Sequence, residues 1–241
     1  MELTPLQRMA AAARDEAAAA GKLTGKAKPQ GGHPSWVPKV GKRPEWTKKL
    51  GGKPKGASHP ASVAGRGYRP GGGEAAKQYK ERTGIQAPRI IAWEITRSCN
   101  LSCEHCRAAA EFGYYPGELS LEECKAVIDN IASITNPILI LTGGEPFMRP
   151  DIWEIVDYAR EAGCMPVIGT NGTTITPEIA QKMAEHRISR ISISLDFPDA
   201  ERHDAFRGQQ GSFDDAVRGI KLAQEHGIGV QVNTTVTKKN A

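Results

Sequence analysis

The sequence predicts an α/β fold with a parallel sheet, preceded by a basic N-terminal region that is mostly disordered. From residue 88 onward, short apolar segments alternate with amphipathic segments of helical period, which is typical of successive βα units. Polar motifs follow directly after the apolar segments, where parallel sheets carry their sites. Before residue 88 the chain is rich in Gly, Pro and Lys and has almost no periodic apolar pattern.

Five segments are predicted as strands because they are short and rich in apolar or β-branched residues. They span residues 89–96, 137–142, 166–170, 190–196 and 228–235. The second is apolar throughout, which indicates a strand buried on both faces. In the fourth, Ile191 and Ile193 alternate with serines. Three polar side chains share one face of the fifth, Gln231, Asn233 and Thr235, and indicate either a lined cavity or a polar sheet edge.

Four helices are predicted between these strands from their capping residues. They begin after Ser120, at Asp151, after Thr176 and after Ser212. Ser120 and Glu123 have the spacing of a capping box. Pro177 follows Thr176 and suits the first position of a helix, where its missing N–H has no partner to lose. Helices between the strands imply a parallel sheet.

The positive charge of the chain belongs to its N-terminal third. Residues 1–88 carry 17 Lys and Arg against 6 Asp and Glu, a net charge of +11, whereas the whole chain carries +5, so the remainder is acidic. A basic tail can contact nucleic acid or acidic lipid, but this composition is more typical of a solvated tail. We therefore expect an extension over residues 1–86, a core domain over residues 87–241 and no nucleic-acid partner.

The apolar segments and the cysteines indicate a cytoplasmic protein. No apolar run approaches the roughly 18 residues that span a membrane, and residues 1–21 lack the apolar centre of a secretory signal. Three of the five cysteines fall within eight residues, which is typical of metal ligation in a reducing compartment rather than of disulfides.

Those three cysteines, Cys99, Cys103 and Cys106, form a C-x3-C-x2-C motif after the first strand. Thiolates favour iron–sulfur clusters or zinc. Three thiolates leave one iron of a [4Fe–4S] cluster without a protein ligand, as catalytic metal sites require. The alternative is a zinc site with His105 or a distant residue as the fourth ligand. The two remaining cysteines, Cys124 and Cys164, are expected in the core.

Further motifs follow the next three strands. After the second come Gly143, Gly144 and Glu145, where glycines permit close approach of a ligand and the carboxylate suits a cationic amine. Thr170 begins a Thr-Asn-Gly turn after the third strand. At the end of the fourth, Ser194 and Asp196 are expected to point the same way, so both would reach a ribose diol.

Taken together, these motifs resemble the radical S-adenosylmethionine (radical SAM) superfamily over about residues 88–241. The resemblance implies a parallel (β/α)6 barrel, of which about five of the six strands are present, so the chain is expected to be truncated at its C-terminus. It also implies that the cysteine triplet ligates a [4Fe–4S] cluster with one iron open for SAM. His105 stands where the family usually has an aromatic residue near the adenine.

The same resemblance assigns SAM contacts to the other motifs. The Gly143, Gly144 and Glu145 segment would bind the SAM amino group, Ser194 and Asp196 would contact the ribose, and Thr170 would line the same site. The family passes one electron from the reduced cluster to SAM and forms a 5′-deoxyadenosyl radical, which abstracts a substrate hydrogen. An electron donor such as flavodoxin or ferredoxin is therefore expected.

Three strings are similar to the branch of the family that tailors tetrapyrroles, such as the heme b synthases of the alternative heme pathway and the heme d1 enzymes. They are AWEITR at residues 92–97, CRAAA at 106–110 and HDAFRG at 203–208. This resemblance implies oxidative decarboxylation of iron-coproporphyrin III propionates. Arg97 and Arg107 would either pair with substrate carboxylates or neutralise the cluster. A peptide-modifying maturase and a non-catalytic metal-binding module remain as alternatives.

Overall fold

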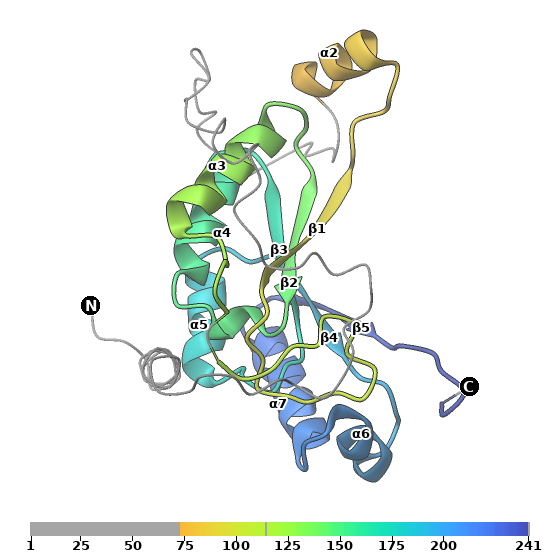
Figure 1. Cartoon of the computed structure of the whole chain (residues 1–241). Coiled ribbons are helices and arrows are strands. Elements are labelled where there is room, and N and C mark those ends of the chain that lie inside the picture. The colour runs from red at the N-terminus through yellow and green to blue at the C-terminus, as the bar shows by residue number, and fades with distance from the viewer. Residues whose placement is uncertain (1–72, 114, 241) are drawn as a thin grey trace, which may run out of the picture.

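The computed structural model describes residues 73–113 and 115–240, and its centre is one parallel sheet of five strands (Figure 1). The strands are adjacent in the order in which they occur in the sequence, β1-β2-β3-β4-β5. Their bounds are β1 Ile90–Thr96, β2 Ile138–Gly143, β3 Met165–Thr170, β4 Arg190–Ser194 and β5 Gly229–Asn233. The predicted fold class and all five predicted strands are confirmed.

Helices connect the strands, and α3, α4, α5 and α7 lie along one face of the sheet (Figure 1). The helical elements are α2 Glu74–Thr83, α3 Leu121–Ala132, the short 3-10 helix η2 Pro146–Met148, α4 Ile152–Glu161, α5 Pro177–Glu185, α6 Ala200–Arg207 and α7 Ser212–Glu225. Cys124 and Cys164 are buried in the core beneath these helices, as predicted.

The two faces of the sheet have different surroundings because side chains alternate along each strand. In β2, Leu139 and Leu141 are fully buried beneath the helices, whereas Ile138 and Ile140 line a cavity on the other side. The prediction that this strand is buried on both faces was therefore wrong. The curved sheet leaves its inner face open, and apolar side chains form part of the cavity wall.

Most predicted helix starts are confirmed, but the start of α7 differs. Ser120 and Glu123 form the predicted capping box, and the Thr176 hydroxyl accepts a hydrogen bond from the amide of Ile179. Ser212 does not cap α7, because Gly211 occupies the N-cap position and the Ser212 hydroxyl instead donates to Asp204 in α6 at 2.9 Å. A tertiary contact has replaced the local cap.

Two α-helices and the short 3-10 helix η2 were not predicted. Helix α6 lies in the segment recognised only as the HDAFRG string, and α2 lies in the extension expected to be mostly disordered. Helix α2 follows Gly73 and ends at Gly84, whose left-handed backbone suits a glycine C-cap. The remainder of that expected extension, residues 1–72, lies outside the described residues, so the domain boundary stays a prediction. Within the described part of the chain, every helix is too short or too polar to cross a membrane.

Candidate functional site

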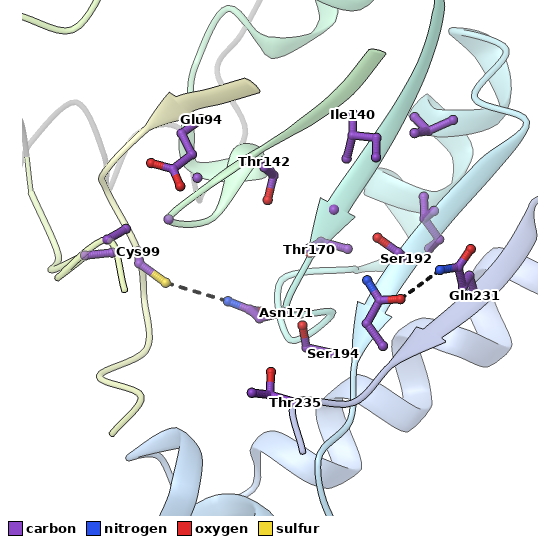
Figure 2. A pocket seen from close by; sticks show the side chains of 18 of the residues that line it. Glu94, Cys99, Ile140, Thr142, Thr170, Asn171, Ser192, Ser194, Gln231 and Thr235 are labelled. Atoms are coloured by element: carbon purple, nitrogen blue, oxygen red, sulfur yellow. Dashed lines mark hydrogen bonds between the residues drawn. The ribbon is translucent and has the colours of Figure 1, made fainter. Parts of the chain in front are cut away.

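A cavity of about 1170 Å³ lies against the inner face of the sheet and extends past the carboxyl ends of the strands. All three cysteines of the motif line it, together with polar side chains from β2, β3, β4 and β5. Figure 2 shows Thr142, Thr170, Ser192, Ser194 and Gln231 around this space, with Cys99 on its opposite side. The polar face of β5 therefore lines the cavity, and β5 is also an edge strand of the described sheet.

The loop that carries Cys99, Cys103 and Cys106, called the cysteine loop below, is held in a compact fold by backbone hydrogen bonds and by the side chain of Arg97. The amide of Cys99 donates to the carbonyl of Glu111 at 2.9 Å, and the amide of Cys106 donates to the carbonyl of Cys103 at 3.0 Å. Arg97 donates to the carbonyls of Ala108 at 3.0 Å and Ala109 at 3.2 Å, and its guanidinium lies 4.8 Å from the centre of the Tyr115 ring. Arg97 is therefore occupied in shaping the loop.

Arg107 has a different environment. Its side chain is 82% exposed and pairs with Glu94 at 3.4 Å, and both residues line the cavity. An exposed pair of this kind contributes little to stability. Of the two arginines considered from the sequence, only Arg107 has a guanidinium available to a carboxylate ligand.

Backbone amides point at two of the sulfur atoms. The amide of Leu101 lies 3.5 Å from Cys99 Sγ, and the amide of Ala110 lies 3.3 Å from Cys106 Sγ. Asn171 Nδ2 lies 3.9 Å from Cys99 Sγ, which Figure 2 shows as a dashed line. Donors to sulfur stabilise thiolate, which is the form that ligates metal.

The electrostatics of the loop fit an iron–sulfur cluster. Burial raises the pKa of Cys99 to about 11, and burial also raises the pKa of Cys103. Thiolates here therefore need compensating positive charge, which the irons of a cluster supply. In the described part of the chain, no three His, Cys, Asp or Glu side chains are grouped closely enough to hold a single metal ion.

The two glycines after β2 are required by the cysteine loop itself. The amide of Gly144 donates to the carbonyl of Thr96, and the amide of Glu145 donates to the carbonyl of Ser98, both at 2.8 Å. A Cβ on Gly143 would lie 2.1 Å from Thr96 O, and one on Gly144 would lie 2.2 Å from Ser98 O. Both glycines also line the cavity, and their contact with SAM stays a prediction.

Glu145 does not reach the cavity wall. Its carboxylate is fully buried and accepts hydrogen bonds from the Thr170 hydroxyl at 2.8 Å, the amide of Asn171 at 2.9 Å and the amide of Phe147 at 3.3 Å. Burial raises the pKa of Glu145 to about 7, although these hydrogen bonds oppose the shift. The structure thus gives Glu145 a role in joining the loops after β2 and β3, and it does not bring the carboxylate to the predicted amine site.

Ser194 and Asp196 also separate. Ser194 ends β4 and lines the cavity, but the strand stops there, so the alternation of side chains does not extend to Asp196. Asp196 is buried, lies 2.6 Å from Arg207 Nη2 through Oδ2, and accepts a hydrogen bond from the amide of Thr235 at 2.8 Å through Oδ1. The structure supports only Ser194 of this pair as a residue facing the cavity.

His105 and Thr170 both line the cavity, and their role as cofactor contacts stays a prediction. The His105 ring stacks on Phe206, with ring centres 4.2 Å apart and planes 8° apart. Sequence reasoning missed Asn171, read only as part of a turn, and Arg207, read only as part of a string. The position of Asn171 directly after a strand was a usable signal, whereas no spacing rule could have placed Arg207 beside the cysteines.

The family model described as the radical SAM superfamily matches residues 93–240, which is more than half of the chain. The chain belongs to the radical SAM superfamily. Enzymes of this superfamily use a [4Fe–4S] cluster and SAM, and the cysteine triplet and the lined cavity fit these two groups. The resemblance inferred from the motifs is therefore confirmed.

Curated relatives and solved structures extend this result. An AdoMet-dependent heme synthase of Nitratidesulfovibrio vulgaris is 53% identical over 152 residues, covering 63% of this chain and 41% of that protein. A mycofactocin maturase MftC of Mycobacterium tuberculosis is 42% identical over 158 residues, covering 65% of this chain and 40% of that protein. The chain spans less than half the length of the curated relatives it matches.

The fold also matches that of Streptococcus suis SuiB bound to S-adenosylmethionine, with a TM-score of 0.57 and 16% identity, over 68% of this chain and 39% of that one. At this identity the likeness concerns the fold alone. It agrees with the α/β fold and parallel sheet of this chain.

Proposed function

We propose that this protein is a radical SAM enzyme that acts on a tetrapyrrole, with Cys99, Cys103 and Cys106 as the ligands of its cluster. The observation that carries the proposal is that the three sulfurs, both glycines after β2 and the polar ends of β3 to β5 open into one cavity. When bound, the cluster and SAM supply a 5′-deoxyadenosyl radical that abstracts hydrogen from a substrate.

The chain contributes position and enclosure to this chemistry. Gly143 and Gly144 bring the backbone of the second loop to the cavity, where it would contact the SAM amino acid moiety, and their lack of side chains leaves room for the backbone of the cysteine loop. His105, Thr170 and Ser194 add polar and aromatic contacts for the adenosyl part. Glu145 and Asp196 act behind this wall through Thr170, Asn171 and Arg207.

For the substrate, we infer iron-coproporphyrin III, with oxidative decarboxylation of propionates to vinyl groups. Each propionate would lose one hydrogen atom to the radical, then CO2 and one electron, and the electron would pass to a one-electron acceptor of the ferredoxin class. The similarity to a heme synthase and the exposed Arg107 at the cavity support this substrate, because guanidinium groups pair well with carboxylates. A reductant such as flavodoxin or ferredoxin is proposed as the electron donor.

A peptide-modifying maturase is the second candidate. The similarity to mycofactocin maturase MftC covers nearly the same share of the chain as the similarity to the heme synthase. The two candidates share the cluster and SAM chemistry and differ in the substrate.

The first test is anaerobic reconstitution with iron and sulfide, followed by dithionite and SAM. The expected result is a brown protein that releases 5′-deoxyadenosine, and Cys103→Ala is the matched variant that should do neither. Stoichiometric zinc binding with intact SAM would instead support the non-catalytic metal-binding module.

The second test adds iron-coproporphyrin III to the active protein. We expect loss of CO2 and a porphyrin of correspondingly lower mass. Arg107→Gln should raise the concentration of porphyrin needed for half-maximal turnover while 5′-deoxyadenosine release without substrate stays unchanged. If SAM is cleaved but the porphyrin is unaltered, the heme assignment is wrong and a precursor peptide becomes the next substrate to test.

A further inference from the structure

The C-terminal end of α6 packs directly against the cysteine loop. The amide of Glu104 donates to the carbonyl of Phe206 at 3.0 Å, and the Ser102 hydroxyl donates to the carbonyl of Gly208 at 3.3 Å. Gly208 has a left-handed backbone, and a Cβ there would lie 2.5 Å from Ser102 O. This part of α6 therefore has a fixed position relative to the sulfur atoms.

Arg207 lies at the centre of this contact. Its Nη1 atom lies 3.7 Å from Cys103 Sγ, and its Nη2 atom lies 2.6 Å from Asp196 Oδ2. The side chain of Arg207 is 8% exposed and that of Asp196 is fully buried. The guanidinium is thus held in place by a buried carboxylate while its other arm points at a sulfur that is proposed to bind iron.

The charge of Arg207 distinguishes Cys103 from the other two cysteines. Cys99 and Cys106 receive hydrogen bonds from neutral donors, the amides of Leu101 and Ala110, whereas Cys103 receives one from a cation. Asp196 pairs with the other arm of the guanidinium, so the cation is the member of the ion pair that contacts this sulfur.

We propose that Arg207 is a positioning residue that raises the reduction potential of the cluster through Cys103, with Asp196 fixing the guanidinium in place. Reduction adds one negative charge to the cluster, and a cation in a poorly hydrated site beside a ligand sulfur stabilises that charge. This inference rests on the proposed cluster site, and it assigns the ion pair a role in electron uptake that is separate from SAM binding.

The experiment is a redox titration of the reconstituted protein, followed by electron paramagnetic resonance, with SAM omitted. In Arg207→Gln, the ratio of reduced to oxidised cluster at the wild-type midpoint should fall about tenfold, which is about 59 mV for a one-electron couple. Arg207→Lys keeps the charge and should restore most of the ratio. Asp196→Asn keeps an oxygen that can accept a hydrogen bond from Arg207 but removes a negative charge, so the guanidinium should stay in place and the potential should move in the opposite direction.

The matched control is Arg202→Gln. Arg202 lies on the same helix and pairs with Asp199, but its side chain is 56% exposed, so its charge is screened by water and its removal should leave the potential unchanged. Iron content and thermal unfolding of each variant check that the site is intact. SAM affinity, measured separately, detects any role of Arg207 in binding SAM directly.

Several results would overturn the inference. One is an unchanged reduction potential in iron-loaded Arg207→Gln. Another is a lower reduction potential in Asp196→Asn, since structural damage and not charge would then be the cause. If Arg207→Gln fails to hold iron, Asp196→Asn becomes the deciding variant. A higher reduction potential in it supports the inference, and a lower one refutes it. A wild-type protein that binds no cluster would refute the proposed function as well, whereas a loaded wild type with an insensitive potential would refute only the role of Arg207.

Discussion

Replacement of Gly144 by alanine should displace the cysteine loop. The new Cβ would lie 2.2 Å from Ser98 O and 2.8 Å from Arg97 O, whereas comfortable contacts between such atoms are about 3.5 Å. The backbone would have to separate by about 1 Å, which weakens the hydrogen bonds from Gly144 N to Thr96 O and from Glu145 N to Ser98 O. Overpacking costs about 1–3 kcal/mol and each lost hydrogen bond about 1 kcal/mol, so the expected total is about 3–5 kcal/mol.

The assay is urea unfolding of the metal-free protein followed by circular dichroism, together with iron content after reconstitution. Gly84→Ala is the matched control, because Gly84 has φ +73° but no atom within 4 Å of its would-be Cβ. The free energy of unfolding of the control should fall by only about 1 kcal/mol, the cost of a left-handed backbone at alanine, and the control should load iron normally.

Two results would refute this reasoning. The first is a decrease of about 1 kcal/mol or less in the free energy of unfolding of Gly144→Ala, similar to the decrease in Gly84→Ala. The second is a full complement of iron in Gly144→Ala, because the clash is with the backbone that carries the cysteines. Retained iron together with lost SAM binding would mean that Gly144 serves the ligand alone.

Three further predictions test other contacts of the protein. Burial raises the pKa of Glu145 from 4.5 to about 7, so the folded state keeps a proton that the unfolded chain releases, and stability should fall by about 3 kcal/mol as pH rises through that window. Glu145→Gln should remove this fall, as measured by urea unfolding at about pH 5 and about pH 8, and an unchanged slope would contradict the assignment. Cys103→Ala should abolish cluster binding whereas Cys164→Ala should not, and a full cluster in Cys103→Ala would refute its role as a ligand. Arg149→Met should lower the free energy of unfolding in urea by about 3 kcal/mol, because buried Arg149 pairs with Asp151 at 2.7 Å and donates to two backbone carbonyls. A decrease below about 1 kcal/mol would contradict this prediction.

The positions of the strands and the start of most helices could be predicted because their signals are local. Ser120 with Glu123, and Thr176 with Pro177, specify helix starts within four residues of sequence. The start of α7 could not be predicted in this way. There, the Asp204 carboxylate accepts hydrogen bonds from the amides of Gly211 and Phe213, so a side chain from α6 caps the helix.

The site shows the same division between local and tertiary signals. Three cysteines, two glycines and Ser194 were found from their spacing and their places after strands, and the structure brings all of them to one cavity. Asp196 was misplaced because the alternation rule was extended two residues beyond the end of β4. Arg207 is 104 residues from Cys103 in sequence, and only the packing of α6 brings the two together.

The Gly143 to Glu145 segment contacts the protein on both sides, and these contacts explain why it contains two glycines and a glutamate even without a bound ligand. Because β1, β2 and β3 are adjacent and parallel, the loops at their carboxyl ends meet at one edge of the sheet. The glycines let the second loop bond to the backbone before Cys99, and Glu145 binds the third loop, whose Asn171 reaches Cys99 Sγ. A substitution in this segment should therefore act first on the cysteine loop. Iron content should fall before SAM affinity does, and the protein that still holds iron should bind SAM nearly as tightly as wild type.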